Sequence, residues 1–240
     1  MKKILACIVL TILFVIYPQE VKAMHIAEGF LPVKWCIAYF AIIIPFLVLG
    51  IREIRKKTHN NKELKMMLAL VAAYVFVLSA MKIPSVNGSC SHPTGIGLGA
   101  ILFGPMVMSV VGFVVLVFQA LLLAHGGITT LGANTFSMGI VGALVSYGVY
   151  RLFKNKNRNL AVFLAASLGD LFTYITTSIQ LGLVFPSKTT GVVGSILSFL
   201  SIFAITQIPL AIVEGVLTVV IFDFIEKHCK NELTLLGEGV

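Results

Sequence analysis

The sequence predicts an all-α membrane protein, a polytopic helical bundle. Of its 240 residues, 58% are hydrophobic and only 12% are charged, a balance typical of chains that cross a membrane several times and leave no soluble domain. Long apolar segments follow one another, separated by short loops in which basic residues collect. The net charge of +8 therefore reports membrane topology and does not indicate a nucleic-acid partner.

Residues 1–23 have the three parts of a cleavable signal peptide. Two lysines precede an apolar run over 4–17, and small residues stand at the cleavage positions. The apolar run is short for a membrane span. We expect cleavage after Ala23, which leaves 24–240 as a single transmembrane domain with a cytoplasmic tail at about 226–240. The alternative is that the leader stays as a first membrane anchor.

The apolar segments predict the membrane elements of the mature chain. They cover residues 33–50, 64–83, 95–124, 131–153, 160–185 and 192–224. The basic loops at 52–57 and 151–158 and the basic end at 226–230 should face the cytoplasm of a prokaryotic cell. This places the mature amino terminus outside the cell membrane and the carboxyl terminus inside.

Segment 95–124 must begin and end on the outer side, because 131–153 supplies the one crossing between the outer loop 84–94 and the second basic loop. A break at Gly104-Pro105 solves the problem, since proline removes a backbone donor and clashes with the preceding turn. We predict a pair of short helices or a re-entrant element, and about seven membrane elements in total. Irregular backbone at membrane depth is tolerated where it lines an enclosed site, so the break indicates the functional centre.

Cleavage after Ala23 would create a metal-binding amino terminus. The Met24 amine, the His25 backbone nitrogen and the His25 imidazole can close chelate rings on one metal ion. His92, in the outer loop, offers a fourth nitrogen on the same side of the membrane. Four nitrogens in a near-planar set suit Ni(II), Cu(II) or low-spin Co(II), whereas Zn(II) prefers tetrahedral sites.

Other polar residues near the outer face are candidates for orienting the ligands or gating the site. Glu28 is the acid near the terminus, and we expect it to anchor the terminal loop by hydrogen bonds. The remaining candidates are Ser89, Ser91, Thr94, His125, Asn134 and Thr135. For His125, Asn134 and Thr135 a purely structural role is equally open. Cys90 could bind metal as a thiolate, but we interpret it as a small buried residue.

Two acids, Asp170 and Glu214, lie within apolar segments. Ionisable groups at membrane depth are functional candidates by default. Here we expect them to fix helix packing through hydrogen bonds.

Four stretches of the chain closely resemble the CbiM/NikM family of substrate-capture membrane subunits. They are 24–32 (MHIAEGFLP), 82–105 (KIPSVNGSCSHPTGIGLGAILFGP), 121–138 (LLLAHGGITTLGANTFSM) and 207–215 (QIPLAIVEG). The resemblance covers essentially the whole mature chain. It implies a cobalt energy-coupling factor (ECF) transporter that takes up Co(II) for cobalamin synthesis. In related nickel subunits the ligand positions map onto Met24, His25 and His92.

The resemblance also implies partner chains. These are ATPase subunits of the CbiO type, a transmembrane coupling subunit of the CbiQ type and a small membrane accessory subunit of the CbiN type. The chain itself has no glycine-rich phosphate loop followed by Lys and Ser or Thr. We therefore expect a transporter subunit without enzymatic activity, whose energy comes from a partner.

Three alternatives stay open. A nickel-specific subunit of the same family would use almost the same ligands, because ligand type does not separate Ni(II) from Co(II). A metal-dependent intramembrane enzyme would need a helical His-Glu-x-x-His motif, or an acid beside an open metal position, and neither pattern is present. A scaffold without a small-molecule site would bind no metal.

Overall fold

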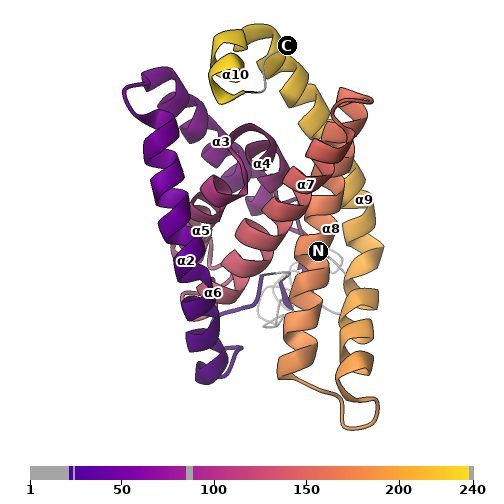
Figure 1. The fold of residues 1–240 in the computed structure, drawn as a ribbon. Coiled ribbons are helices and arrows are strands. Elements are labelled where there is room, and N and C mark those ends of the chain that lie inside the picture. The colour runs from indigo at the N-terminus through magenta and orange to yellow at the C-terminus, as the bar shows by residue number, and fades with distance from the viewer. Residues whose placement is uncertain (1–21, 24, 85–88, 238–240) are drawn as a thin grey trace, which may run out of the picture.

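The computed structural model describes residues 22–23, 25–84 and 89–237. The predicted signal peptide, apart from its last two residues, lies outside the described residues, and so does Met24. Six helices of the described chain are long and apolar enough to cross a membrane. The predicted polytopic helical bundle is confirmed (Figure 1).

Helices account for most of the described chain, which also contains three very short strands. The helices are α2 (Val33–Thr58), α3 (Lys62–Ala80), α4 (Ile96–Phe103), α5 (Pro105–Leu123), α6 (Leu131–Asn134), the π-helix η2 (Thr135–Gly142), α7 (Ala143–Phe153), α8 (Arg158–Val184), α9 (Gly191–His228) and α10 (Lys230–Leu236). The strands are β1 (Lys22–Ala23), β2 (Ile83–Pro84) and β3 (Ser89–Ser91).

The predicted break at Gly104-Pro105 is confirmed, but the expectation that it indicates the functional centre is wrong. The break lies beside Arg52 and Lys57, at the basic end of α2. Helix α4 ends at Phe103, Gly104 takes a positive φ of 87°, and Pro105 is the first residue of α5. Proline is well suited to that first position, because its fixed φ is helical and its missing N–H has no helical partner there. The second helix is longer than expected and counts among the six spans. Together with the short α4, these make seven membrane elements.

Basic residues that we assigned to loops lie instead in helices. Helix α2 continues through 52–57, and α9 continues to His228. A charged residue ends an apolar run but does not end a helix, because Lys and Arg side chains reach water from the last turn and favour the carboxyl end of a helix. The predicted tail is also folded, since α10 packs onto the bundle through the buried Leu233.

The predicted segment 131–153 is one continuous helical run with an unexpected middle. Its central part, η2, is a π-helix. At Gly139 this part packs against α5 so closely that a Cβ added to Gly112 would lie 3.0 Å from the Gly139 Cα atom. π-Helical turns are rare and occur mostly inside longer α-helices. The apolar pattern therefore predicted a helix here but not its π-helical part.

The three strands form one small sheet in the order β1-β3-β2. Strand β1 runs parallel to β3, with Ala23 opposite Cys90, and β2 runs antiparallel to β3. In the uncleaved chain the sheet therefore brings the residues just before His25 beside those just before His92. Cleavage after Ala23 would remove β1 and leave the pairing of β2 with β3.

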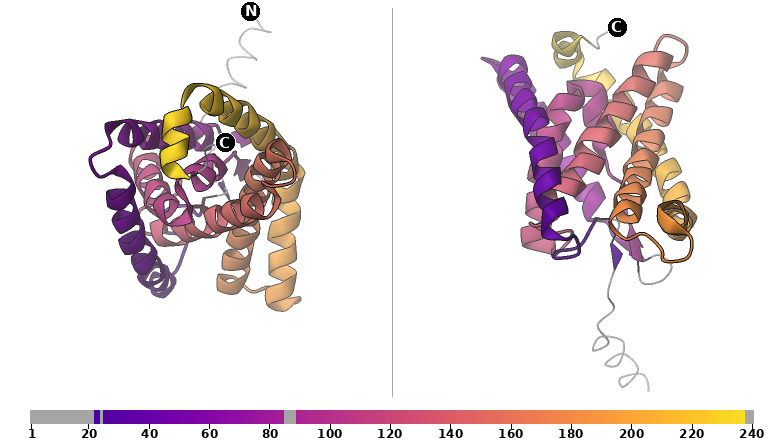
Figure 2. Two further views of the ribbon diagram at one scale, coloured as in Figure 1. Left: turned by 45° about the horizontal axis from the view of Figure 1, so that its top comes forward. Right: turned by 60° about the horizontal axis from the view of Figure 1, so that its bottom comes forward.

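Glycine allows α4 to lie in the middle of the bundle. All eight residues of α4 are buried, and in the left view of Figure 2 the long helices surround this magenta segment. Gly97 packs against α8, where a Cβ at Gly97 would lie only 2.7 Å from the Cα of Ala166. No side chain fits at this contact unless the α8 backbone moves.

We predict that Gly97→Ala destabilises the fold by about 1–3 kcal/mol, the usual cost of overpacking a core. Gly148→Ala, in α7, is the matched control, because no atom lies within 4 Å of its Cβ position. This control should be neutral or stabilising by about 0.5–1 kcal/mol, since alanine is the better helix former. Thermal unfolding in detergent measures both variants, and equal midpoints would contradict the close contact between α4 and α8.

Candidate metal centre

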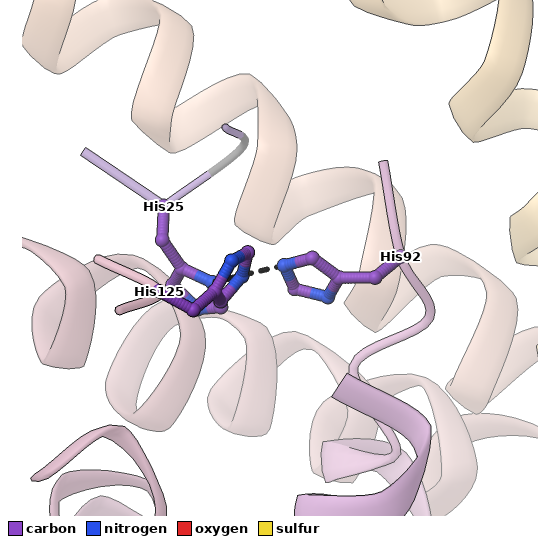
Figure 3. A group of neighbouring side chains, drawn as sticks. All are labelled: His25, His92 and His125. Carbon is purple, nitrogen blue, oxygen red and sulfur yellow. Dashed lines mark hydrogen bonds between the residues drawn. The ribbon is translucent and has the colours of Figure 1, made fainter. Parts of the chain in front are cut away.

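Three histidines from distant parts of the chain meet at one point. His25 follows β1, His92 follows β3 and His125 follows α5, and Figure 3 shows their rings gathered together. Their exposed fractions are 3%, 0% and 1%. Within the part of the chain that the structure describes, they are the one group of three metal-ligating side chains whose ligand atoms all lie within 4.8 Å of one another.

The Nδ1 atom of His25 lies at the centre of this group. It is 2.7 Å from Nε2 of His125 and 2.9 Å from Nε2 of His92. The rings of His25 and His92 are stacked, with 14° between their planes, and the ring of His125 stands at 84° to that of His25. Three imidazole nitrogens thus converge on one small volume.

The surroundings of His92 determine which of its nitrogens is available. Its Nδ1 lies 3.1 Å from the carbonyl oxygen of Pro93, and only a protonated Nδ1 can donate to that carbonyl. In the neutral ring, Nε2 then presents a lone pair to His25. The Nδ1 atom of His25 faces two nitrogens, Nε2 of His92 and Nε2 of His125, but it has either one hydrogen to donate or one lone pair to accept. It can therefore form a hydrogen bond with only one of them, whereas a cation between the three nitrogens would satisfy all three.

Burial keeps the three rings neutral. It lowers the pKa of His92 to about 4 and the pKa of His125 to about 2. Burial, and then the neighbouring His92, lowers the pKa of His25 well below its ordinary range. Neutral imidazole is the form that binds metal. Near neutral pH the rings can bind a metal ion without first losing a proton.

Asn134, at the end of α6, holds the terminal segment in place. Its side-chain oxygen accepts a hydrogen bond from the Ile26 N–H at 2.8 Å, and its amide donates to the Ile26 carbonyl at 3.1 Å. The Thr130 hydroxyl donates to the same carbonyl at 2.6 Å. Because Ile26 follows His25 directly, these three bonds fix the main chain that carries the His25 ring.

Glu28 ties the terminal segment to the loop after His125. Its carboxylate accepts a hydrogen bond from the Thr129 N–H at 3.2 Å. Gly127 makes this approach possible, because a Cβ at Gly127 would lie 2.5 Å from the Glu28 Cα atom. His25 and His125 therefore stand on segments that are bound directly to each other.

The loop that carries His92 is held by α9. The amide of Gln207 donates to the His92 carbonyl oxygen at 3.2 Å. The hydroxyl of Ser91, one residue before, lies 2.7 Å from the hydroxyl of Thr206. Ser91, a candidate for orienting His92, thus fixes the main chain beside it.

The two buried acids hold neighbouring segments by hydrogen bonds, as we expected. Glu214 accepts from the N–H groups of Thr94 at 2.5 Å and Gly95 at 2.9 Å, where its carboxylate also complements the amino-terminal end of α4. Asp170, in α8, accepts a hydrogen bond from Gln207 at 2.5 Å. Helix α9 is thereby connected to the loop before α4, and α8 is connected to α9.

The remaining candidates lie in different settings. Thr135 begins η2, and its buried hydroxyl has no hydrogen-bond partner among the described residues. Ser89 and Cys90 belong to β3, where their backbone pairs with β1. The terminal amine of Met24, which completes the predicted chelate, lies outside the described residues.

His125 is more central than we expected from the sequence. We expected it to orient the ligands or gate the site, yet its Nε2 is as close to His25 as that of His92. The signal for it was the pair Gly126-Gly127, since adjacent glycines permit close backbone approach. A single sequence does not show which histidine such a loop approaches.

Comparison with known proteins shows the family of the chain. The family model described as "Cobalt uptake substrate-specific transmembrane region" matches residues 25–232. The cobalt transport protein CbiM of Clostridium tetani is 62% identical over 229 residues, which cover 95% of each chain. The protein of the same name from Listeria seeligeri is 53% identical over 243 residues, covering 98% of this chain and 100% of the relative.

A solved crystal structure of a truncated transition metal transporter has the same fold. It is 28% identical and superposes with a TM-score of 0.74, covering 85% of this chain and 99% of the other. Residues 25–232, which the family model matches, include all three histidines and the six helices of the described residues that are long and apolar enough to cross a membrane. The chain is a multi-pass membrane protein that belongs to the CbiM family of cobalt uptake substrate-specific transmembrane regions.

Proposed function

We propose that this chain captures Co(II) outside the cell as the substrate-specific membrane component of an ATP-driven ECF uptake system that supplies cobalamin synthesis. The observation that carries the proposal is the convergence of the His92 and His125 Nε2 atoms on the His25 Nδ1 atom, which brings three buried, neutral imidazole rings together. The names of the CbiM relatives support cobalt as the substrate.

The proposed ligands are the Met24 amine, the His25 backbone nitrogen, His25 Nδ1 and His92 Nε2. If the backbone nitrogen of His25 binds the metal, the imidazole can close a six-membered chelate ring only through its Nδ1 atom. This Nδ1 atom faces Nε2 of His92 at 2.9 Å. Metal–nitrogen bonds of about 2.0–2.1 Å at right angles separate neighbouring nitrogens by about 2.8–3.0 Å. The spacing of His25 and His92 therefore suits adjacent positions in one plane.

His125 supplies a further donor. Its Nε2 lies 2.7 Å from His25 Nδ1, and its ring stands nearly perpendicular to the ring of His25. A ligand above the plane of the other nitrogens would approach in this manner. Nitrogen ligands alone do not separate Co(II) from Ni(II), so a nickel-specific subunit is the alternative.

The proposed orientation has the mature amino terminus outside and the carboxyl terminus in the cytoplasm. Basic residues occupy the last turns of α2, α7 and α9, and Figure 1 shows these three helix ends at the same end of the bundle. An excess of Lys and Arg marks the cytoplasmic side.

We infer that ATPase subunits, a coupling subunit and a small accessory subunit complete the transporter. We also infer that the leader is removed after Ala23.

The first test determines the amino terminus and the metal content of one purified sample. We expect a chain that begins at Met24 and holds one Co(II). Adding a single residue before Met24 should abolish tight binding, because it removes the amine from the chelate and His25 from second place. A chain that keeps residues 1–23 and binds Co(II) would move the site to the histidines alone. A wild-type chain without affinity for Co(II) would overturn the proposal.

His92→Ala and His125→Ala should each weaken Co(II) binding by more than the roughly 10–100-fold typical of residues outside the ligand shell. His59→Ala is the matched control, since His59 is exposed at the end of α2. Competition with a chelator measures all three affinities. Wild-type affinity in His125→Ala would exclude His125 as a donor and leave the four-nitrogen set.

The affinity for Co(II) should fall with one constant slope as the pH is lowered from about 7 to 5. The amine, with a reference pKa of about 7.7–8.0, and the backbone amide must lose protons to bind. Because the pKa of His92 is lowered to about 4, its ring stays neutral throughout this range and adds nothing to the slope. Chelator competition at each pH measures it. A slope that steepens below pH 6.5, where ordinary histidines protonate, would contradict the burial of the rings.

A further inference from the structure

The loop that carries His92 contacts one face of α9 at two levels. Gln207 donates to the His92 carbonyl, and Glu214 accepts from the Thr94 N–H. These two α9 residues are seven positions apart, which places them on the same face of the helix, about two turns from each other. Both side chains have an exposed fraction of 0%, so no water competes for these bonds.

The other two histidines are held elsewhere. Asn134 and Thr130 bind the main chain after His25, and the His125 N–H donates to the Gln119 carbonyl at the end of α5. None of these bonds involves α9. The hydrogen bonds therefore hold His25 and His125 to one part of the bundle and His92 to another. Apolar packing still links the two parts, since Ile26 shares a buried cluster with Tyr174 of α8 and Phe203 of α9.

Gln207 is itself held in a fixed orientation. Its amide nitrogen donates both to the His92 carbonyl at 3.2 Å and to the Asp170 carboxylate at 2.5 Å. Helices α8 and α9 are joined nearby, since the Ser167 hydroxyl donates to the Ala211 carbonyl at 2.8 Å. The position of His92 thus follows the position of the α8–α9 pair.

Helix α9 has a weak point beside this contact. Pro209 lies inside the helix, two residues after Gln207. Because proline has no N–H, the carbonyl four residues earlier loses its helical partner, and helices bend most often at such places. A bend here would move Gln207, and His92 with it.

We propose that Gln207 and Glu214 are positioning residues that fix His92 to α9, so that the metal ion is held between two separately anchored halves of the site. This inference rests on the proposed capture of Co(II). A movement of α9 withdraws His92 without breaking the hydrogen bonds that hold the His25 and His125 segments. Breaking the Gln207 contact therefore speeds release of the metal, while the terminal chelate still captures it.

The test compares Gln207→Met with Tyr174→Phe in the purified full chain that begins at Met24. Methionine keeps the length of the side chain but cannot donate to the His92 carbonyl. Tyr174→Phe is the matched control, because the Tyr174 hydroxyl donates from α8 to the Phe199 and Leu200 carbonyls of α9, away from the His92 loop. For each variant we measure Co(II) dissociation into excess chelator, the visible absorption spectrum of bound Co(II), and the unfolding midpoint without metal.

Gln207→Met should release Co(II) about 10–100-fold faster than wild type and should change the Co(II) spectrum, while Tyr174→Phe keeps the wild-type rate and spectrum. Glu214→Gln, which retains one acceptor oxygen, should shift the rate in the same direction by less, and it serves if Gln207→Met does not fold. Wild-type rates in the folded Gln207 and Glu214 variants, or equal acceleration in Tyr174→Phe, would overturn the inference. Loss of binding in the wild-type chain would instead overturn the proposed function.

Discussion

The terminal segment enters the bundle as non-helical backbone, and the arrangement of the site follows from the need to pair its buried N–H and C=O groups. Unpaired backbone groups are costly where water is absent. Ile26, with an exposed fraction of only 3%, has both of its backbone groups bonded to side chains of Asn134 and Thr130. A helix cannot offer its own backbone for this purpose, so polar side chains on α6 and the preceding loop are required. They fix His25 as a consequence.

Close approach is the second requirement. Gly127 lies directly against the main chain of Glu28, and Gly132 lies against the main chain of Phe40, where a Cβ would be 2.7 Å from the Phe40 nitrogen. Larger residues at either position would push the terminal segment and α2 away from the loop that carries His125. The small residues and the polar side chains therefore act together. The former bring the segments into contact, and the latter satisfy the backbone that becomes buried.

The parts of the fold that the sequence predicted are those set by strong, local signals. Topology and Pro105 together predicted the break between α4 and α5, and the charged loops predicted the number of crossings. Helix ends were predicted less well, because a basic residue such as Arg52 interrupts hydrophobicity without interrupting the helix. The π-helix depends on contacts between η2 and α5 that are remote in sequence. At the site, the proximity of His25 and His92 was expected from their shared side, while the central place of His125 depends on how its loop folds onto Glu28.

The same burial that prepares the histidines for a metal ion also closes the route to them. All three rings are almost completely buried, so an ion bound there as proposed could enter or leave only when the terminal segment or the His92 loop moves. The bonds that hold the terminal segment run to α6 and its preceding loop, and the bonds that hold the His92 loop run to α9. Either part can therefore move without breaking the hydrogen bonds that hold the other. A metal ion bound between them would favour the closed arrangement by joining the two parts, and reopening requires work on only one of them.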